Sequence, residues 1–547
     1  MNTANPQSRA VEISAVHDLL AQAVAKFPDI IAVDFLGKRT SYQALGKLVE
    51  RATAGFQRLG VTKGTTVALC LPNTPYYVIC YYAILRAGGI VVNLSPLYVE
   101  KELRHFLADS GARIAVTLDI AELFDKFKPI VADQALDHLI VGSMLDCLDP
   151  VKKFGFWLTR RKSLADIPKE NSYLRFSAFL AGDQPARTMP CDPINDLAVL
   201  QYTGGTTGIP KAAMLTHANL TANCSQVSHR VADVPAGAGM LTLVPLFHVF
   251  AMTVALNFSV SLGLKIILLP RYDKDLLRKT LARTKPLFFP GVPTIYANII
   301  EAARKEKWDL SSIRYCVSGA APLPEEIRTQ FEQLSHCQLV EGYGLSETSP
   351  VVACNYFGDV RDGSIGLPVD DTLVEIRDLN NPAQQAPQGE KGEVCVKGPQ
   401  VMQGYWKRPD ETAKVFVDGW LRTGDVGYRD QDGYIFLVDR IKDLIISGGY
   451  NVYPRMVEEA LYKHQAVLEA VVVGIPDAKR GQVPKAYVKL QDGASVTEAE
   501  LQAFLATQLS PVERPKSIAF RDALPKTMIG KLSRKDLLAE EAAKPLS

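Results

Sequence analysis

Short apolar runs alternate with longer amphipathic stretches over the first half of the chain. Residues 42–60, for example, carry apolar positions at helical spacing. Five runs have the length of buried strands: TVALCL (66–71), ARIAVTL (112–118), HLIVGS (138–143), DLAVLQY (196–202) and KIILLP (265–270). Strands that alternate with helices predict an α/β fold, in which a large N-terminal domain contains layered, mostly parallel sheets.

The pattern changes twice toward the C-terminus. Short β runs (TLVEIRD, GEVCVKG, GYIFLVD) separated by Gly, Pro and Asn or Asp turns predict a β-rich subdomain at about 365–440. Two strand-like runs, VLEAVVVGI and KAYVKL, a helix near 497–509 and a basic tail follow. Because 547 residues exceed what one core holds, we expect a large domain at 1–441 and a small α+β domain at 442–547.

Composition and charge narrow the function classes. The net charge of +2 gives no global sign of nucleic-acid binding. Nine scattered cysteines without a CxxC pair indicate reduced thiols, and the eight histidines show no zinc-like spacing. The N-terminus lacks the basic and apolar regions of a signal peptide. We therefore expect a cytoplasmic protein, peripheral at most on the inner face of a membrane.

Two apolar segments raise the question of membrane contact. Residues 240–264 are long enough to span a bilayer, but interior Pro, His, Asn and Gly favour a buried strand–loop–helix. Residues 152–162, KKFGFWLTRRK, mix five cations with aromatics. This mixture suits peripheral docking on an anionic membrane. The alternative is an exposed connecting segment whose aromatics pack back on the domain.

The segment YTGGTTGIPKAAMLTH, residues 202–217, is suited to holding an anion. It is not a P-loop, which needs Lys directly after Gly, because Ile209 and Pro210 intervene. Its glycines allow backbone N–H groups to turn toward a ligand, and its threonines add hydroxyl donors. The candidate phosphate contacts are Thr203, Gly204, Gly205, Thr206, Thr207, Gly208 and the cation Lys211. A flexible surface turn is the alternative, and it leaves this combination unexplained.

Four further motifs follow: EGYGLSETSP (341–350), WLRTGD (420–425), DRIKDLIISGGYNVYP (439–454) and LPKTMIGK (524–531). Together with the phosphate loop, this ordered set resembles the adenylate-forming enzymes, which include acyl-CoA synthetases, firefly luciferase and nonribosomal peptide adenylation domains. The resemblance covers nearly the whole chain. It implies that ATP activates a carboxylic acid as an acyl-adenylate, and that the small domain is mobile and rotates between two half-reactions.

The residue chemistry of these motifs also suits ATP. Tyr343 offers a flat face for adenine, and Asp425 has two acceptor oxygens for the ribose diol. Ser346 can donate to a phosphate oxygen, and Glu347 is a hard oxygen ligand for Mg²⁺. Taken alone, a tight turn with surface carboxylates would explain the same residues. The expected ATP contacts here are Gly319, Ala320, Ala321, Glu341, Gly342, Tyr343, Gly344, Ser346, Asp425 and Arg440.

The resemblance assigns roles to other matching positions. It implies that Lys531 enters the site during adenylation and contacts the α-phosphate and the carboxylate, where negative charge concentrates. A solvated lysine at 531 and a core histidine at 248 are the alternatives. The implied catalytic set is Lys531, Glu347, His248 and Lys211; the hinge is Lys442; and the CoA tunnel is lined by Gly448, Gly449 and Tyr450.

Within the family, several stretches resemble the bacterial long-chain fatty acid–CoA ligases: YTGGTTG with Gly205, VEGYGLSET, GSIGLPV, KGPQVMQGYW and GYNVYP. The resemblance implies fatty acid, ATP and CoA as substrates. The insertion of fatty acyl-AMP ligases has no room before DRIKD, which favours CoA as acceptor. Ligases for medium-chain, aryl or dicarboxylic acids, and a non-catalytic adenylate-binding protein, remain alternatives. A long-chain enzyme should have a deep apolar tunnel, which we place at 248–262 and 291–296. The oligomeric state stays open.

Overall fold

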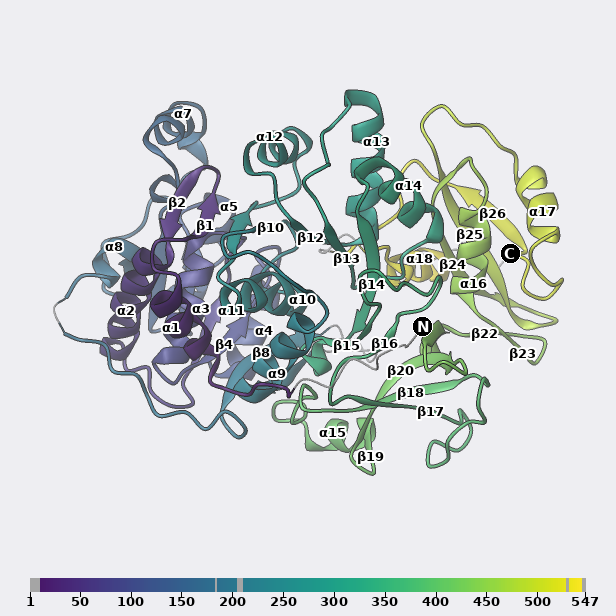
Figure 1. Ribbon diagram of the computed structural model, residues 1–547, viewed down its shortest axis with the longest axis horizontal. Helices are drawn as coiled ribbons and strands as arrows, with labels where there is room; N and C mark the ends of the chain where they lie inside the picture. The colour runs from purple at the N-terminus through teal and green to yellow at the C-terminus, as the bar shows by residue number, and fades with distance from the viewer. Residues whose placement is uncertain (1–9, 183, 204–209, 528–530, 544–547) are drawn as a thin grey trace.

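Two large sheets form the core of the N-terminal part in the computed structural model, which describes residues 10–182, 184–203, 210–527 and 531–543 (Figure 1). The first has the strand order β7-β6-β5-β3-β4-β8-β9, and its pairs are parallel except β8 with β9. Its strands are β3 (Thr66–Leu69), β4 (Ile90–Asn93), β5 (Ile114–Leu118), β6 (His138–Gly142), β7 (Tyr173–Arg175), β8 (Leu197–Thr203) and β9 (Lys211–Thr216).

The second sheet has the order β16-β15-β14-β13-β12-β10-β11-β1-β2. Its inner strands β1 and β10–β14 pair in parallel, whereas β2, β15 and β16 pair antiparallel at the two edges. The strands are β1 (Ile31–Phe35), β2 (Lys38–Ser41), β10 (Gly239–Thr242), β11 (Lys265–Leu268), β12 (Phe288–Gly291), β13 (Tyr315–Ser318), β14 (Gln338–Gly344), β15 (Val351–Cys354) and β16 (Leu367–Pro368).

Helices cover these sheets, and four of those described begin at a residue whose side chain caps them: α2 (Tyr42–Arg58), α7 (Pro150–Arg160), α9 (His217–Ser228) and α12 (Lys274–Thr284). The Ser41 side chain accepts from Ala44 N at the start of α2, and Thr216 with Asn219 forms a capping box on α9. The others are α1 (Val16–Lys26), α3 (Pro75–Arg86), α4 (Glu100–Ser110), α5 (Ala121–Phe124), α6 (Lys128–Ala132), α8 (Phe176–Phe179), α10 (Val249–Ala251), α11 (Phe258–Ser261), α13 (Pro293–Glu306) and α14 (Glu325–Ser335).

Two smaller sheets follow in the chain. One contains β17 (Leu373–Arg377), β18 (Gly392–Lys397), β19 (Phe416–Val417), β20 (Trp420–Arg429) and β21 (Ile435–Arg440), with α15 (Pro409–Val415) beside it. The other contains β22 (Ile445–Ser447), β23 (Tyr450–Val452), β24 (Val467–Asp477), β25 (Gly481–Leu490) and β26 (Ser517–Phe520). Three helices accompany the second: α16 (Pro454–Tyr462), α17 (Glu498–Ala506) and α18 (Arg534–Ala542).

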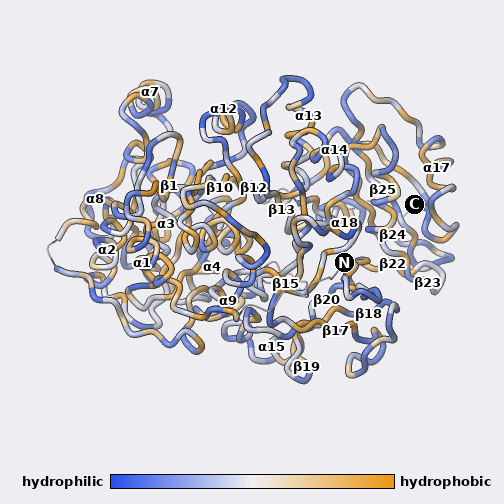
Figure 2. Tube along the Cα trace, viewed as in Figure 1, coloured by the Kyte–Doolittle hydropathy of each residue, from blue (hydrophilic) through white to orange (hydrophobic). Residues whose placement is uncertain are grey.

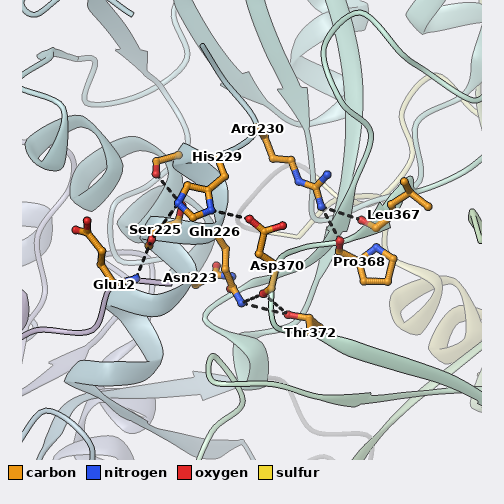
Figure 3. Close-up of polar contacts among 11 residues, drawn as sticks. Glu12, Asn223, Ser225, Gln226, His229, Arg230, Leu367, Pro368, Asp370 and Thr372 are labelled. Atoms are coloured by element: carbon orange, nitrogen blue, oxygen red, sulfur yellow. Dashed lines mark hydrogen bonds and ion pairs between the residues drawn. The ribbon is translucent and has the colours of Figure 1, made fainter. Parts of the chain in front are cut away.

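Polar contacts join the end of α9 and the two residues after it to β16 and to the segment that leads from β16 into the β-rich part (Figure 3). His229 Nδ1 lies 2.6 Å from Asp370 Oδ2, and Gln226 donates to the Asp370 carbonyl at 2.5 Å. The Arg230 guanidinium donates to the Pro368 carbonyl at 2.6 Å and lies 3.8 Å from the centre of the Tyr356 ring. These contacts fix where the β-rich part, and the site residues on it, stand relative to the first two sheets.

The expected α/β class with a β-rich part and a small C-terminal α+β unit is confirmed. The five strand-like runs form β3, β5, β6, β8 and β11, and the helical pattern at 42–60 forms α2. The stretch after the 497–509 helix was predicted as a basic tail, and this is wrong, because it contributes β26 and α18. The many charged residues in this stretch obscured the hydrophobic pattern, because only a few of its apolar residues, such as Ile518 and Leu537, are buried.

The apolar stretch 240–264 is interior rather than a bilayer span. It supplies β10, α10, a π-helical turn at Met252–Asn257 and α11, and most of its side chains are buried in the core. Within the described part of the chain, no helix has the length and hydropathy needed to cross a membrane.

Candidate active site

A cavity of about 1110 Å³ lies where the N-terminal, β-rich and C-terminal parts meet. Its walls come from α4, the loop after β13, β14, β20, β21, α16 and the segment before α18. Parallel strands β13 and β14 deliver their carboxyl ends to it, which is where open α/β sheets place ligands. The predicted site residues that line it are Ala320, Ala321, Glu341, Gly342, Tyr343, Gly344, Asp425, Arg440, Lys442 and Lys531.

A buried carboxylate sits at the centre of the wall formed by β14, β20 and β21. The Tyr343 hydroxyl donates to Asp425 Oδ2 at 2.7 Å, and Arg440 Nε lies 2.9 Å from Asp425 Oδ1. Asp425 and Arg440 are directly paired across β20 and β21, so the sheet register fixes this ion pair. The arrangement presents a fixed acceptor and an adjacent cation to the cavity.

The turn that carries the EGYGLSETSP motif is sterically constrained. A Cβ on Gly344 would lie 1.8 Å from the Pro350 carbonyl oxygen, so no other residue fits there without moving the backbone. Ser346 and Glu347 follow in a short 3₁₀ turn, Ser346–Thr348. On the neighbouring strand end, Gly319 donates its N–H to the Gly291 carbonyl, and Ala320 adopts φ +64°. In both loops, backbone contacts and backbone dihedral angles therefore constrain the conformation.

The phosphate-loop lysine belongs to a tight network. Lys211 Nζ forms an ion pair with Glu411 of α15 and lies 5.3 Å from the centre of the Tyr405 ring. The Tyr405 hydroxyl donates to Glu347 Oε1 at 2.8 Å, and Thr203 Oγ1 donates to the Lys211 carbonyl at 3.3 Å. The ion pair with Lys211 lowers the pKa of Glu411 to about 2. The network brings Thr203, Lys211 and Glu347 together, although they do not line the cavity.

Lys531 reaches the cavity from the C-terminal part. Burial, together with the nearby Arg440 and Arg534 cations, lowers the pKa of its ammonium to about 8, and the Asp425 and Asp443 carboxylates partly oppose this shift. Its backbone N–H donates to Thr527 Oγ1 at 3.2 Å. Among the residues that the structure describes, Lys531 has no carboxylate within ion-pair distance. It is therefore a partly desolvated cation beside the Asp425–Arg440 pair.

Two arginines that the sequence analysis did not single out, Arg455 and Arg534, form ion pairs between the C-terminal part and the rest; Arg534 does so through Asp439 of β21, at 3.7 Å. Arg455 of α16 lies 3.8 Å from Glu341 of β14, and its backbone N–H donates to Asp439 at 2.7 Å. Burial raises the pKa of Glu341 to about 7, while Arg455 opposes this shift. Within the C-terminal part, Arg534 also contacts Asp443 at 3.1 Å and Glu458 at 2.7 Å. Such pairs join residues distant in the sequence, so no local pattern could have revealed them.

Tyr405 and Glu411 were also missed as site residues. Tyr405 lies in KGPQVMQGYW, a stretch whose only recognised signal was its resemblance to one enzyme group. The fold brings it to the site because Tyr405 forms a β-bridge with Ala213 of β9. The one sequence signal that could have identified Tyr405 as a site residue was its position as an aromatic residue in a motif to which no role had been assigned.

Other predicted site residues lie elsewhere or outside the described residues. Gly204, Gly205, Thr206, Thr207 and Gly208 fall outside the described residues. His248 precedes the first residue of α10 without a capping hydrogen bond from its side chain, and burial lowers its pKa to about 4. Gly448 and Gly449 form the turn between β22 and β23, where Tyr450 is 67% exposed. The structure does not bring this turn to the cavity.

The expected acid tunnel at 248–262 and 291–296 is only partly matched. The cavity touches Pro293 and Thr294, but no residue of 248–262 lines it. Most of that segment packs into the core instead, because its apolar side chains fill the space between α1, α9 and the second sheet.

Candidate metal ligands are single carboxylates rather than a cage. Within the described ranges, no group of three or more His, Cys, Asp or Glu side chains could hold an ion. Glu347 offers a carboxylate beside the strand pair that carries the phosphate loop. Mg²⁺ bound to nucleotide phosphates usually takes one or two carboxylates together with phosphate oxygens and water. The donor set at Glu347 fits that type of binding.

Comparison with known families matches both parts of the chain. Residues 20–406 match the family described as AMP-binding enzyme, and residues 456–531 match the AMP-binding enzyme C-terminal domain. A long-chain-fatty-acid–CoA ligase from Bacillus subtilis (strain 168) is 43% identical, over 98% of this chain and 96% of the relative. A feruloyl-CoA synthase from Amycolatopsis sp is 35% identical, over 92% of this chain and 94% of the relative.

Solved structures share the same fold over nearly the whole chain. ATP-bound MatB from Rhodopseudomonas palustris is 28% identical, with a TM-score of 0.82, and the match covers 96% of this chain and 99% of that one. An anthranilate CoA ligase in complex with anthranoyl-AMP is 25% identical, with a TM-score of 0.87, over 98% of both chains.

Proposed function

The chain belongs to the AMP-binding enzyme family, and from this premise we propose that it is a fatty acid–CoA ligase. Its first half-reaction joins a fatty acid carboxylate to the α-phosphate of ATP and releases pyrophosphate. In the second, the CoA thiol attacks the acyl-adenylate and AMP leaves. The observation that carries the proposal is the full-length similarity to a long-chain-fatty-acid–CoA ligase, at 43% identity.

Nucleotide binding follows from the wall that β14, β20 and β21 form. Asp425 can accept from both ribose hydroxyls, since each of its oxygens keeps a lone pair beyond its contacts with Tyr343 and Arg440. The Tyr343 ring and the backbone of Gly319, Ala320 and Ala321 would border the adenine. Because Asp425 is already held by two donors, it needs little reorganisation when the ribose binds.

The phosphates would lie between the loop at 203–211 and the 3₁₀ turn that carries Ser346 and Glu347. Lys211 supplies a fixed cation there, because Glu411 and the Tyr405 ring restrict its ammonium. Glu347 would hold Mg²⁺, which when bound neutralises phosphate charge and favours the departure of pyrophosphate. The Tyr405 hydroxyl orients the Glu347 carboxylate toward that task.

Lys531 would act on the adenylation step. A cation that contacts the α-phosphate and the carboxylate is most effective as negative charge concentrates during bond formation, so it stabilises the transition state more than the ground state. Its desolvated position beside Asp425 and Arg440 strengthens that interaction. His248 is neutral at physiological pH, because burial lowers its pKa to about 4, so beside the acid it would be a polar contact without charge.

The second half-reaction requires a different arrangement. The C-terminal part, which we place at 442–547, would rotate about Lys442 relative to residues 1–441. Lys531 would then leave, and the turn of Gly448, Gly449 and Tyr450 would approach to guide CoA. This turn is exposed and does not line the cavity here, and two consecutive glycines with positive φ allow a close approach of backbone to ligand.

The acid specificity is best tested with a panel of acids. ATP-dependent thioester formation should be measured with CoA and acetate, octanoate, palmitate, oleate, benzoate or pimelate, with AMP and pyrophosphate as readouts. We expect the highest kcat/KM with palmitate or oleate. A maximum with benzoate or pimelate would retain the chemistry and refute the long-chain assignment. No product from any acid would refute the ligase assignment itself.

A further inference from the structure

Helix α7, Pro150–Arg160, presents an apolar face to solvent. Val151 is 82% exposed, Phe154 is 65% exposed and Leu158 is 68% exposed, and Trp157 joins them at 43%. Their spacing along the helix puts the four side chains on one face. None of the helix's residues is buried, and the helix lies at the periphery of the molecule, with hydrophobic and hydrophilic positions interspersed along it (Figures 1 and 2).

The opposite side of α7 is the one that attaches it to the protein. Phe156 packs against the main hydrophobic core, and the Lys152 ammonium binds the Leu36 carbonyl in the turn between β1 and β2. The Asp149 side chain caps the helix by accepting from Lys152 N at 2.9 Å. Because these contacts fix the rotation of the helix, the four apolar side chains cannot turn inward without breaking them.

Cations surround the apolar face. Lys152 and Lys153 form ion pairs with Asp149 and Asp146, at 3.2 Å and 2.9 Å. Beyond these pairs the C-terminal end of the segment carries Arg160, Arg161 and Lys162, all exposed. The Arg161 guanidinium lies 5.5 Å from the centre of the Trp157 ring, so that the charge borders the aromatic surface. The segment therefore combines exposed apolar side chains with a net positive charge.

We propose that α7 docks on an anionic lipid membrane, lying in the interface with Val151, Phe154, Trp157 and Leu158 inserted among the lipids. Charge complementarity identifies this partner: exposed aromatics bordered by arginine and lysine match the boundary between acyl chains and anionic headgroups. The Trp157 ring and its Arg161 neighbour suit that boundary, because one is amphipathic and the other reaches the phosphates. This inference does not depend on the proposed ligase activity.

The test is co-sedimentation of the full chain with vesicles of phosphatidylcholine alone or with about 30% phosphatidylglycerol. We expect binding to the anionic vesicles, a blue shift of Trp157 fluorescence, and weaker binding in 1 M salt, where the Debye length falls from about 10 Å to about 3 Å. A Trp157→Phe variant identifies the source of the shift. Equal binding to neutral vesicles, or no binding to either, would overturn the proposal.

Matched variants separate the two parts of the surface. Phe154→Ser with Leu158→Ser should lower the partition coefficient by about tenfold or more, whereas Ile194→Ser with Leu373→Ser, two equally exposed residues elsewhere, should leave it unchanged. Arg160→Gln, Arg161→Gln and Lys162→Gln should each lower it by roughly fivefold. Lys47→Gln, Lys169→Gln and Lys463→Gln, also exposed, are the charge controls.

Two further readouts keep the result decisive. The six substituted positions, 154, 157, 158, 160, 161 and 162, are all exposed, so the thermal unfolding midpoint should not change in the variants. A serine or glutamine variant that keeps its midpoint yet binds vesicles as tightly as the parent chain would contradict the proposal. Sedimentation velocity tests the alternative that a second copy of the chain covers this face of α7. A dimer that the Phe154→Ser and Leu158→Ser changes dissociate, with vesicle binding intact, would assign this face to a second copy and overturn membrane docking.

Discussion

Lys211 and Lys531 bring cations toward the proposed phosphate site from two parts of the molecule, and their surroundings differ. Lys211 starts β9, inside the N-terminal part, and is held by Glu411 and the Tyr405 ring. Lys531 comes from the C-terminal part and, among the described residues, has no carboxylate at ion-pair distance; burial lowers its pKa to about 8. An anchored cation suits binding in both half-reactions, whereas an unpaired one can be removed between them.

The largest expected effect comes from Lys531→Ala. Removal of one transition-state contact costs about 3–4 kcal/mol, so overall thioester formation should fall by about 10²–10³. The KM for ATP should change little, because the contact forms mainly in the transition state. Steady-state kinetics with ATP, acid and CoA measure both constants. A large increase in the KM for ATP with kcat unchanged would assign Lys531 to ground-state binding. Lys531 would then have the same role that we propose for Lys211.

Arg455→Met tests whether the contact between α16 and β14 positions the C-terminal part, and with it Lys531, for adenylation. Loss of the guanidinium leaves Glu341 buried without its cation and removes a contact between α16 and β14. We expect adenylation to slow by about tenfold. The effect should be smaller than the effect of breaking a fully charged buried ion pair, because the Glu341 pKa of about 7 lets this carboxyl group become neutral.

The matched control for this change is Arg480→Met, at an exposed arginine of the C-terminal part. Isotope exchange between pyrophosphate and ATP reports adenylation in both variants. Equal rates in Arg455→Met and the parent chain would mean that the contact between Arg455 and Glu341 does not position Lys531.

The pH dependence of adenylation should report the protonation state of Lys531. The folded-state pKa of Lys531 is depressed to about 8, so its cation is present below that pH and is lost as the pH rises through it. In the free enzyme, kcat/KM for adenylation should therefore fall above about pH 8. Lys531→Arg should move that alkaline limb beyond the measurable range, because arginine stays charged. An unchanged limb in Lys531→Arg would show that another group is responsible.

The smallest effect is expected from Tyr405→Phe. The substitution keeps the ring beneath Lys211 and removes only the 2.8 Å hydrogen bond to Glu347. We expect the Mg²⁺ concentration for half-maximal activity to rise by about three- to tenfold, the usual value of one such bond. Titration of activity with Mg²⁺ measures it. A change in the KM for the fatty acid instead would place Tyr405 in the acid pocket.

The sequence was a good guide wherever a local pattern carried the information. Apolar runs located β3, β5, β6, β8 and β11, and the motif order predicted that Tyr343, Asp425, Arg440 and Lys531 belong to one site. The structure places these four residues on one cavity. Their roles in catalysis are predictions.

What the sequence could not show depends on contacts between distant segments. The pairing of Arg455 with Glu341 and of Lys211 with Glu411 requires the packing of separate parts. The segment 152–162 was ambiguous because the same aromatics could have packed inward. Only the fixed rotation of α7 shows that Phe156 faces the core while Phe154 and Leu158 face solvent.

The most direct test of the central claim compares the two half-reactions in Lys531→Ala and Lys211→Ala. Each variant should be given ATP and palmitate, with acyl-adenylate as the readout, and separately palmitoyl-AMP and CoA, with the thioester as the readout. We predict that the adenylation rate of Lys531→Ala falls by about 10²–10³ and that its thioester-forming rate is unchanged. Lys211→Ala should slow adenylation and should also weaken the binding of the nucleotide substrate in both assays, ATP in the first and palmitoyl-AMP in the second. Equal losses in the two half-reactions of Lys531→Ala would contradict the account of a cation that leaves the site.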